Sequence, residues 1–409
     1  MLLAYILLAI AVAGTLSSWA FLLLSIGGAV KFHRDAKAQR LQAQSISNGS
    51  LPPVSLLKPV HGLESRLKEN IESFFRLDYP SYEMIFAADV EDNPALAVVR
   101  EICARHPQIP THIMLTGTPP WPNPPAYAFF RMAEYAKYDI LVTSDSDVFV
   151  DPSYLREVVP PVLDPKNGML TCVYRGKNTG AFWSGVHAVG MSVEMTAGVV
   201  TANLLEGMKF GLGPTIVVRR DALEKIGGFS ALSDYFANDF MLGNLIEKNG
   251  YNIVLSRHII EHVIAPLSFQ RVWQHEVRWA RSTRGSRRWG HLFSGLIYAM
   301  PYGILGFAVA AALGHVWLGV ALFVAALANR IIESWVIGWG ITCDPAARSL
   351  WRYPLRDLLG FFVWCASYLG KYRAVWRNVQ YDLTTDGRAV LRSGQPQSET
   401  PKSFVSRIH

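Results

Sequence analysis

The first 30 residues contain no charged side chain and consist mainly of Leu, Ile, Ala and Val. About 20 apolar residues allow a helix to cross a bilayer, so this segment predicts an uncleaved transmembrane anchor. A cleaved signal peptide is disfavoured, because its positive charges would precede the apolar segment rather than follow it. Basic residues are retained on the cytoplasmic side, so the following domain is expected to face the cytoplasm. The basic side chains after the anchor are Lys31, His33, Arg34, Lys37 and Arg40.

A second apolar region lies near the other end of the chain. Leu292–Leu313 is uncharged, and Val316–Ile341 contains only Arg330 and Glu333 as charged residues, so two membrane spans joined by a turn are predicted. Arg330 and Glu333 lie three residues apart and are expected to pair on one helix face. Leu358–Leu369 is apolar but short, and it fits either a re-entrant segment or a third span.

Between these regions, short apolar runs alternate with helical patterns. This alternation predicts an α/β fold with a largely parallel sheet, in which ligands bind at the carboxyl ends of the strands. The polar residues 36–50 before it predict a linker. The predicted strands are 54–58, 82–88 and 139–144, and the predicted helices are 63–75, 94–105 and 152–159.

Composition narrows the class of protein. Hydrophobic residues make up 50% of the 409 positions and charged residues 17%, which excludes a disordered chain. The net charge of +7 suits a membrane surface or phosphate-bearing substrates, and we expect no nucleic-acid partner. The four cysteines are scattered and indicate no disulfide framework. We predict a multi-pass membrane protein with an anchor (1–30), a linker (31–50), an α/β domain with an interfacial helix (51–289), membrane segments (290–376) and a polar basic tail (377–409).

Three carboxylates follow predicted strands. Asp145 and Asp147 come directly after the apolar run Ile140–Val142, and Asp89 ends the strand before it in the sequence. Carboxylates at this spacing suit Mg²⁺ or Mn²⁺ bridging a diphosphate, since hard cations prefer oxygen ligands. Solvated turns are the alternative, because Asp is also an ordinary turn residue.

Asp239 precedes an apolar helical pattern. One interpretation is a carboxylate that stabilises the helix N-terminus through the helix dipole. The other is a general base that takes a proton from an acceptor hydroxyl.

A basic aromatic segment runs from Arg271 to Trp289. Its arginines at positions 278, 281, 284 and 287 recur every three residues, close to one helical face. An interfacial helix with arginines at lipid headgroups explains most of this pattern. Individual arginines could instead bind phosphate through two parallel hydrogen bonds.

The segment His258–His262 fits H-x-x-E-H, a zinc-peptidase pattern that requires a helix. Its β-branched neighbours predict a strand instead, on which Glu261 would point away from the two histidines. An intramembrane zinc peptidase is therefore disfavoured.

Several motifs together resemble the membrane-bound family 2-type glycosyltransferases, and among these the ceramide glucosyltransferases. They are Val54–Pro59, Phe74–Pro80, Lys137–Asp139 leading into Ser144–Asp147, Gly213–Leu223, Gly227–Phe229 and Asn238-Asp239. The resemblance implies a GT-A domain that binds a UDP-sugar. It would place Asp89 at the nucleotide, Asp145 with Asp147 at the metal-diphosphate, and Asp239 as the catalytic base. Arg278 and Trp279 would end the family's Q/R-x-x-R-W motif, near the diphosphate and the acceptor, together with His275.

Two positions depart from that family pattern. His275 occupies the place where the family has Gln or Arg. Pro125 follows Asn123-Pro124 where the family usually has a Lys, so a contact to the donor phosphate is expected to be missing.

The resemblance implies inverting transfer of a hexose from a UDP-sugar to a membrane lipid hydroxyl, with glucosylation of ceramide favoured. A hopanoid or another lipid, with a donor such as UDP-N-acetylglucosamine, is the alternative within this class. A processive polysaccharide synthase is less favoured, because so few spans follow the α/β domain. A membrane protein that binds a UDP-sugar without catalysis is the non-enzymatic alternative.

Overall fold

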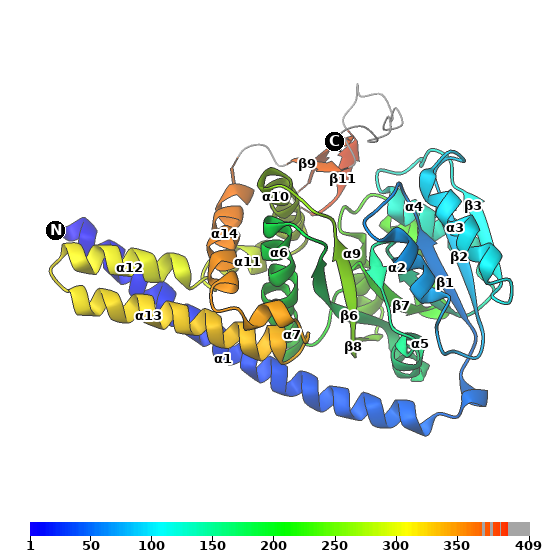
Figure 1. The fold of residues 1–409 in the computed structure, drawn as a ribbon, viewed down its shortest axis with the longest axis horizontal. Helices are drawn as coiled ribbons and strands as arrows, with labels where there is room; N and C mark the ends of the chain where they lie inside the picture. The colour runs from blue at the N-terminus through cyan, green and yellow to red at the C-terminus, as the bar shows by residue number, and fades with distance from the viewer. Residues whose placement is uncertain (370–372, 377–378, 385, 392–409) are drawn as a thin grey trace.

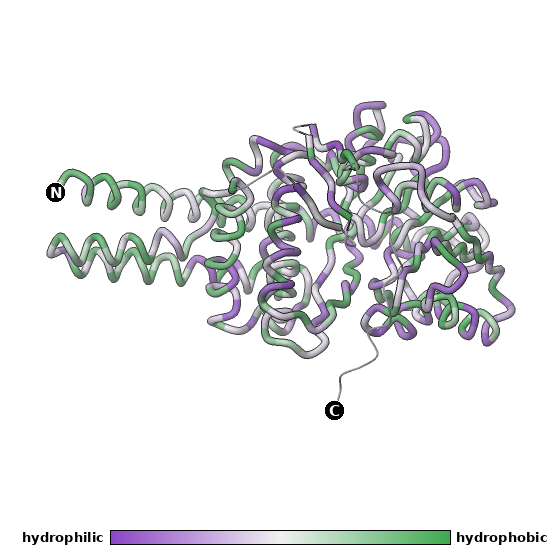
Figure 2. Tube along the Cα trace, turned by 90° about the horizontal axis from the view of Figure 1, so that it is seen from above, coloured by the Kyte–Doolittle hydropathy of each residue, from purple (hydrophilic) through white to green (hydrophobic). Residues whose placement is uncertain are grey.

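The computed structural model describes residues 1–369, 373–376, 379–384 and 386–391. Figure 1 shows an α/β domain and a group of long helices that project from it toward the N-terminus. In Figure 2 these projecting helices are coloured mainly as hydrophobic, whereas the α/β domain mixes hydrophobic and hydrophilic segments.

The α/β domain is built on an eight-stranded sheet with the order β3-β2-β1-β4-β7-β6-β8-β5. The first four strands in this order are parallel, as predicted. The other half is mixed, because β7 runs antiparallel to β4 and β6, and β5 runs antiparallel to β8. The prediction of a largely parallel sheet is thus confirmed for one half of the sheet only. The strands are β1 Val54–Pro59, β2 Tyr82–Ala88, β3 Thr111–Leu115, β4 Ile140–Ser144, β5 Val148–Phe149, β6 Asn167–Asn178, β7 Thr215–Arg219 and β8 Asn252–Ile264.

Local sequence signals explain where the helices begin. The Asn93 side chain accepts a hydrogen bond from the Ala95 amide, so α3 starts at Pro94 as predicted. Arg66 has a left-handed φ of 56°, so α2 begins only at Leu67 rather than at residue 63. The helices of this domain are α2 Leu67–Phe74, α3 Pro94–Arg105, α4 Pro124–Tyr135, α5 Tyr154–Val158, α6 Phe182–Val189, α7 Thr196–Glu206, α8 Arg220–Lys225, α9 Asn238–Lys248, α10 Phe269–Ser286 and α11 Arg288–Ser294.

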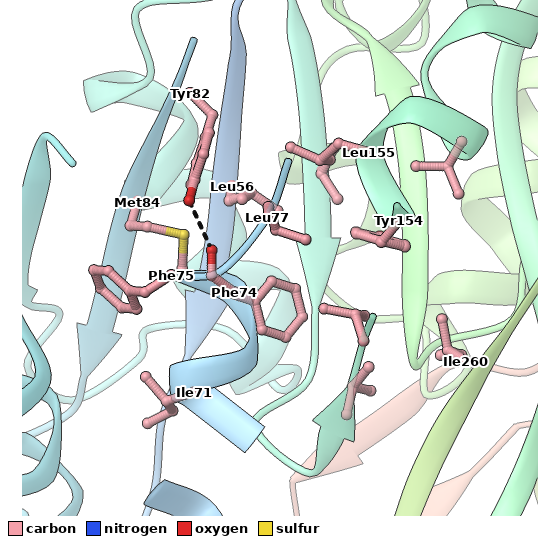
Figure 3. Close-up of a cluster of buried hydrophobic side chains, with 14 of the residues drawn as sticks. Leu56, Ile71, Phe74, Phe75, Leu77, Tyr82, Met84, Tyr154, Leu155 and Ile260 are labelled. Carbon is pink, nitrogen blue, oxygen red and sulfur yellow. Dashed lines mark hydrogen bonds between the residues drawn. The ribbon is translucent and has the colours of Figure 1, made fainter. Parts of the chain in front are cut away.

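Both faces of the central strands are buried. Leu56 packs with Ile71, Phe74 and Met84 on one face (Figure 3), whereas Leu57 belongs to the hydrophobic cluster on the opposite face. The Tyr82 hydroxyl, at the edge of the first cluster, donates a hydrogen bond to the Phe74 carbonyl. Burial on both faces explains why the consecutive residues Leu56 and Leu57 of β1 are both apolar.

The N-terminal helix is longer than predicted. Helix α1 covers Leu2–Ser45, so residues 36–45, which were expected to form a linker, are helical. One of their polar side chains contacts the α/β domain: the Gln39 side-chain amide donates to the Leu255 carbonyl and accepts from the Arg257 backbone amide. The polar part of α1 therefore docks on the domain (Figure 1).

Among the described residues, three helical segments are long and apolar enough to cross a membrane: Leu2–Ser45, Phe182–Glu206 and Val316–Trp339. The second was not predicted as a span, and 67% of its most apolar window is buried inside the protein. The expected span over 292–313 is wrong in length, because its helix α12 covers only Met300–Ala312. The turn after it and helix α13, Val316–Glu333, agree with the prediction, and a π-helical segment, η5, continues α13 over Ser334–Trp339.

The C-terminal part of the chain returns to the α/β domain. Helix α14 covers Arg352–Ser367 and contains most of the short apolar segment. After it, β9 Arg373–Trp376, β10 Val379–Leu383 and β11 Ala389–Leu391 form an antiparallel sheet in the order β11-β10-β9. Part of the expected tail is therefore folded, while residues 392–409 lie outside the described residues.

Buried ionic contacts join these helices. The predicted pair of Arg330 and Glu333 forms at 2.8 Å, and Asp357 of α14 adds a second carboxylate 3.1 Å from the same guanidinium. Asp357 also accepts hydrogen bonds from the amides of Ala299 and Met300 at the start of α12. One arginine thus connects α13 to α14, and Asp357 connects α14 to α12.

Replacing Arg330 by Ala is expected to destabilise the protein by about 3–5 kcal/mol, because two buried carboxylates lose their counter-charge. Thermal unfolding of the detergent-solubilised protein, followed by circular dichroism, measures the change in Tm. Arg34→Ala, at an arginine 76% exposed, is the control. Equal Tm values for the two variants would contradict a structural role for the buried pair.

Candidate functional site

The three predicted donor-site carboxylates lie at one edge of the sheet. Asp89 follows the last residue of β2 and Asp145 follows the last residue of β4, with the parallel strand β1 between them. A separation of two strands corresponds to about 10 Å at the usual inter-strand spacing. Asp89 also accepts a hydrogen bond from the Asn93 amide and lies 3.6 Å from His61.

A buried lysine supports the end of β4. The Lys58 ammonium donates to the backbone carbonyl of Asp145 at 2.5 Å and to the Ser144 hydroxyl at 3.3 Å. Burial lowers the pKa of Lys58 to about 7, although nearby acidic groups oppose this shift. No role was predicted for Lys58, although the sequence places its charge next to the apolar residues Leu56 and Leu57 of a buried strand.

Asp147 is paired with a histidine from a distant strand. His262 Nε2 lies 2.9 Å from Asp147 Oδ2, and β5 brings the two together by pairing with β8. Burial raises the pKa of Asp147, but attraction and hydrogen bonding from His262 outweigh it and hold the pKa below its ordinary value. Burial raises the pKa of Asp145, and repulsion from Asp147 adds to this.

The zinc-peptidase pattern is a strand in the structure, as predicted. His258 contacts Glu157, whereas Glu261 pairs with Arg175 and His262 with Asp147. Among the described residues, no group of three or more His, Cys, Asp and Glu side chains could hold a metal ion.

One carboxylate oxygen of Asp147 is available to bind a divalent cation. Its Oδ1 atom is buried and has no hydrogen-bond partner in the part of the chain that the structure describes. An unpartnered carboxylate oxygen at a strand end fits a hard cation, because burial without a ligand carries a desolvation cost. The two carboxylates of Asp145 and Asp147 thus fit Mg²⁺ or Mn²⁺ chemically.

Asp239 lies in the first turn of α9, against a glycine. A Cβ atom added to Gly213 would lie 2.9 Å from Asp239 Oδ2, so a larger residue would shift the carboxylate from this position. Burial raises the pKa of Asp239, while hydrogen bonds from the backbone of Phe240 and Gly213 oppose the increase. The next residue, Pro214, accepts a hydrogen bond from the Asp145 amide at 3.2 Å. Gly213 therefore contacts Asp239, and the adjacent Pro214 contacts Asp145.

Tyr174 lies among these acidic groups. It is 6% exposed, its ring packs edge-on against His262 at 5.5 Å, and burial raises its pKa. The negative charges of Asp239, Asp145 and Asp147 reinforce that increase, so the tyrosine is within electrostatic reach of all three. Tyr174 was not predicted as a site residue, because nothing in its local sequence distinguishes it from other strand residues.

One arginine of α10 differs from the others in its protein contacts. The side chains of Arg281 and Arg284 donate to backbone carbonyls at and after the end of α14, and Arg287 pairs with Glu206. These three arginines therefore have protein partners, and the expectation that they face lipid headgroups stays a prediction. Arg278 has no hydrogen bond or ion pair among the described residues, and burial lowers its pKa to about 10. An uncompensated, half-buried guanidinium is suited to an anionic ligand.

The predicted acceptor residues lie beside Arg278. The ring of His275 is 4.4 Å from that of Trp279, and its Nδ1 lies 3.3 Å from His187 Nε2. Burial lowers the pKa of His275 to about 3, and the positive charge of Arg278 adds to this, so the imidazole is neutral. The neighbouring Glu276 contacts His187 and Arg356 of α14.

Comparison with solved structures shows the class of fold. A mannosyltransferase from Pyrobaculum calidifontis, solved with GDP-Man and Mn²⁺, superimposes with a TM-score of 0.55 at 17% identity, covering 87% of this chain and 99% of that one. The fold is that of a GT-A glycosyltransferase, with apolar helices before and after it.

Sequence comparison shows the family. The model of glycosyl transferase family 21 matches residues 17–389, and the chain therefore belongs to this family. Ceramide glucosyltransferase 1 of Caenorhabditis elegans is 26% identical over 220 residues, which cover 54% of this chain and 47% of the relative. Ceramide glucosyltransferase 3 of the same organism is 24% identical over 243 residues, covering 59% and 53%. The match spans about half the length of these curated relatives.

Gly213→Ala is expected to lower the turnover number for sugar transfer about 10-fold or more, because the added methyl group displaces the Asp239 carboxylate. Steady-state kinetics measure this effect. The matched control is Gly198→Ala, since a Cβ atom at this exposed helical glycine has no heavy atom within 4 Å. Unchanged turnover in Gly213→Ala would show that the close contact does not matter.

Proposed function

We propose that this chain transfers a hexose from a UDP-sugar to a membrane lipid hydroxyl with inversion, and that it glucosylates ceramide. The observation that carries the proposal is the loop contact: Gly213 touches Asp239 while Pro214 binds the backbone of Asp145. This loop brings a carboxylate suited to a donor diphosphate close to a partly buried carboxylate suited to a base. The names of the family 21 relatives support glucose and ceramide as the substrates.

Donor binding is assigned to residues on the sheet edge and on α10. Asp89 would bind the nucleotide, and Asp145 and Asp147 would hold a divalent cation. When bound, that cation would neutralise the diphosphate charge. Arg278 would contact the leaving diphosphate, which accounts for a half-buried guanidinium with no described protein partner.

The transfer is a single displacement. The lipid hydroxyl oxygen forms a bond to the anomeric carbon while the bond from that carbon to the diphosphate oxygen breaks. The leaving UDP takes the bonding electron pair, and Asp239 takes the hydroxyl proton. Burial raises the pKa of Asp239, which makes it a stronger base than an exposed carboxylate, and activity would be lost as the pH falls through this raised pKa.

Lipid access follows from the arrangement of helices. Trp279 and His275 on α10 would contact the acceptor, which would enter from the bilayer beside the projecting helices. The C-terminal sheet contacts the α/β domain, so the chain after that domain must cross the membrane an even number of times. We propose that α1 crosses the membrane, that α12 and α13 insert into it as a helical hairpin, that α14 does not cross, and that the catalytic domain faces the cytoplasm.

The first experiment is transfer from a panel of labelled UDP-sugars to ceramide, hopanoid and extracted lipids, with and without EDTA. Labelling of ceramide from UDP-glucose is expected, with at least a 100-fold loss in EDTA and in Asp239→Asn. Glu206→Gln, at a partly exposed carboxylate paired with Arg287, controls for the loss of a charge.

Labelling of another lipid, or labelling from UDP-N-acetylglucosamine, would be consistent with the proposed mechanism but would identify a different acceptor or donor. Binding of UDP-sugar without transfer to any lipid would contradict the enzyme and favour the binding protein. Full activity in Asp239→Asn would overturn the assignment of the base.

Arg278→Ala is expected to lower the turnover number about 100-fold, because negative charge on the leaving diphosphate loses its guanidinium partner. Arg271→Ala, an exposed arginine at the start of the same helix, is the control and should be near wild type. Kinetics at varied donor concentration separate turnover from donor KM. Equal effects of the two substitutions would contradict a specific role for Arg278.

A further inference from the structure

The C-terminal sheet, defined as residues 373–376, 379–384 and 386–391, contacts a loop that leads to Asp239. Tyr235 and Arg388 form an antiparallel β-bridge. On either side of it, the Ala389 amide donates to the Asp234 carbonyl at 2.7 Å and the Phe236 amide donates to the Gly387 carbonyl at 3.1 Å. The backbone of the C-terminal sheet thus runs beside residues 234–236.

Side chains strengthen this contact. The Arg388 guanidinium pairs with the Asp234 carboxylate, donates to the Tyr235 hydroxyl at 3.2 Å and lies over its ring at 4.9 Å. The Phe236 ring packs 6.0 Å from the ring of Tyr381, which is 3% exposed. Arg388 therefore contacts two consecutive residues of the loop.

The opposite side of the loop is held by Asn123. Its side-chain amide donates to the Tyr235 carbonyl at 2.5 Å, and its backbone amide donates to the Ser233 carbonyl at 3.1 Å. Asn123 is 6% exposed and also caps α4, so it is a rigid support. The loop is thus fixed between α4 and the C-terminal sheet.

The position of the loop matters because it ends at the catalytic base. Only Ala237 and Asn238 separate Phe236 from Asp239. Residues 233–237 form no helix and no strand longer than the single bridge, so their position depends on the partners on both sides. A shift of about 1 Å in a catalytic group can cost 100-fold in rate.

We propose that the C-terminal sheet is a clamp for the catalytic base, and that Arg388 is a positioning residue that acts through Asp234 on Asp239. The inference rests on the proposed function, because it requires Asp239 to be the base. The pair is partly exposed, at 45% for the Arg388 side chain and 33% for that of Asp234. Such pairs contribute little to stability, so breaking this pair should affect catalysis more than folding.

The test is a charge swap in the full-length protein. Arg388→Glu and Asp234→Arg are each expected to lower the turnover number about 10-fold with donor KM nearly unchanged. The double variant Arg388→Glu/Asp234→Arg is expected to recover most of the lost turnover, and Arg388→Lys should lose less than Arg388→Glu. In the single variants the acid limb of the pH profile of the turnover number should move to higher pH. The reason is that a displaced Asp239 loses the backbone hydrogen bonds that oppose the rise of its pKa.

The matched control is Asp382→Asn. Asp382 pairs with Arg373 at 2.7 Å within the same sheet, at similar exposure, and does not contact the loop. This variant should keep wild-type turnover and an unshifted acid limb. Tm values of all variants should lie close together.

Two results would overturn the clamp. One is wild-type turnover in both single variants, or an equal loss in Asp382→Asn. The other is a double variant that keeps the wild-type Tm but recovers no turnover. Asp239→Asn in the same assay distinguishes the two failures: if it is inactive while the Arg388 variants are normal, only the clamp fails. If Asp239→Asn is fully active, the assignment of the base fails, and the clamp fails with it.

Discussion

The buried contact between Arg330 and Asp357 is the interaction on which the arrangement of the helices depends. It fixes α14 against α13, and Asp357 also binds the first amides of α12. A charge pair that is removed from water must be satisfied closely, so it tolerates little displacement of either helix. The preceding residue, Arg356, pairs with Glu276 on α10, which places the same helix against the candidate site.

This connection explains why the site combines residues from the edge of the sheet and from α10. The sheet edge positions Asp145, and α10 positions Arg278, although 133 residues separate the two in the sequence. Arg281 and Arg284 hold the end of α14 and the chain that follows it, which continues into the C-terminal sheet. Helix α14 and the α/β domain are therefore joined by polar contacts as well as by the chain.

Basic side chains lie beside the carboxylates of the candidate site. Lys58 and His262 face the acidic strand end formed by Asp145 and Asp147. Lys58 is buried beneath the Asp145 carbonyl, whereas His262 contacts a carboxylate directly. When protonated, these two side chains stabilise partly buried carboxylates that would otherwise repel one another. Asp147 keeps one oxygen without a partner among the described residues, which is the oxygen open to a further ligand.

Local patterns were enough to predict the strand 82–88 and the helix 94–105, because periodicity and capping involve near neighbours. They also placed Asp89 and Asp145 at one edge of the sheet, because parallel pairing has a regular geometry. They did not predict that polar residues would continue α1, since that helix is stabilised by docking on β8. The contact of Asp147 with His262 joins residues 115 positions apart. Arg278 and Arg281 are equivalent in helical periodicity, and only the tertiary structure shows that Arg281 has protein partners whereas Arg278 has none among the described residues. Long-range packing determines which charges find partners, and this information is absent from any short segment of the chain.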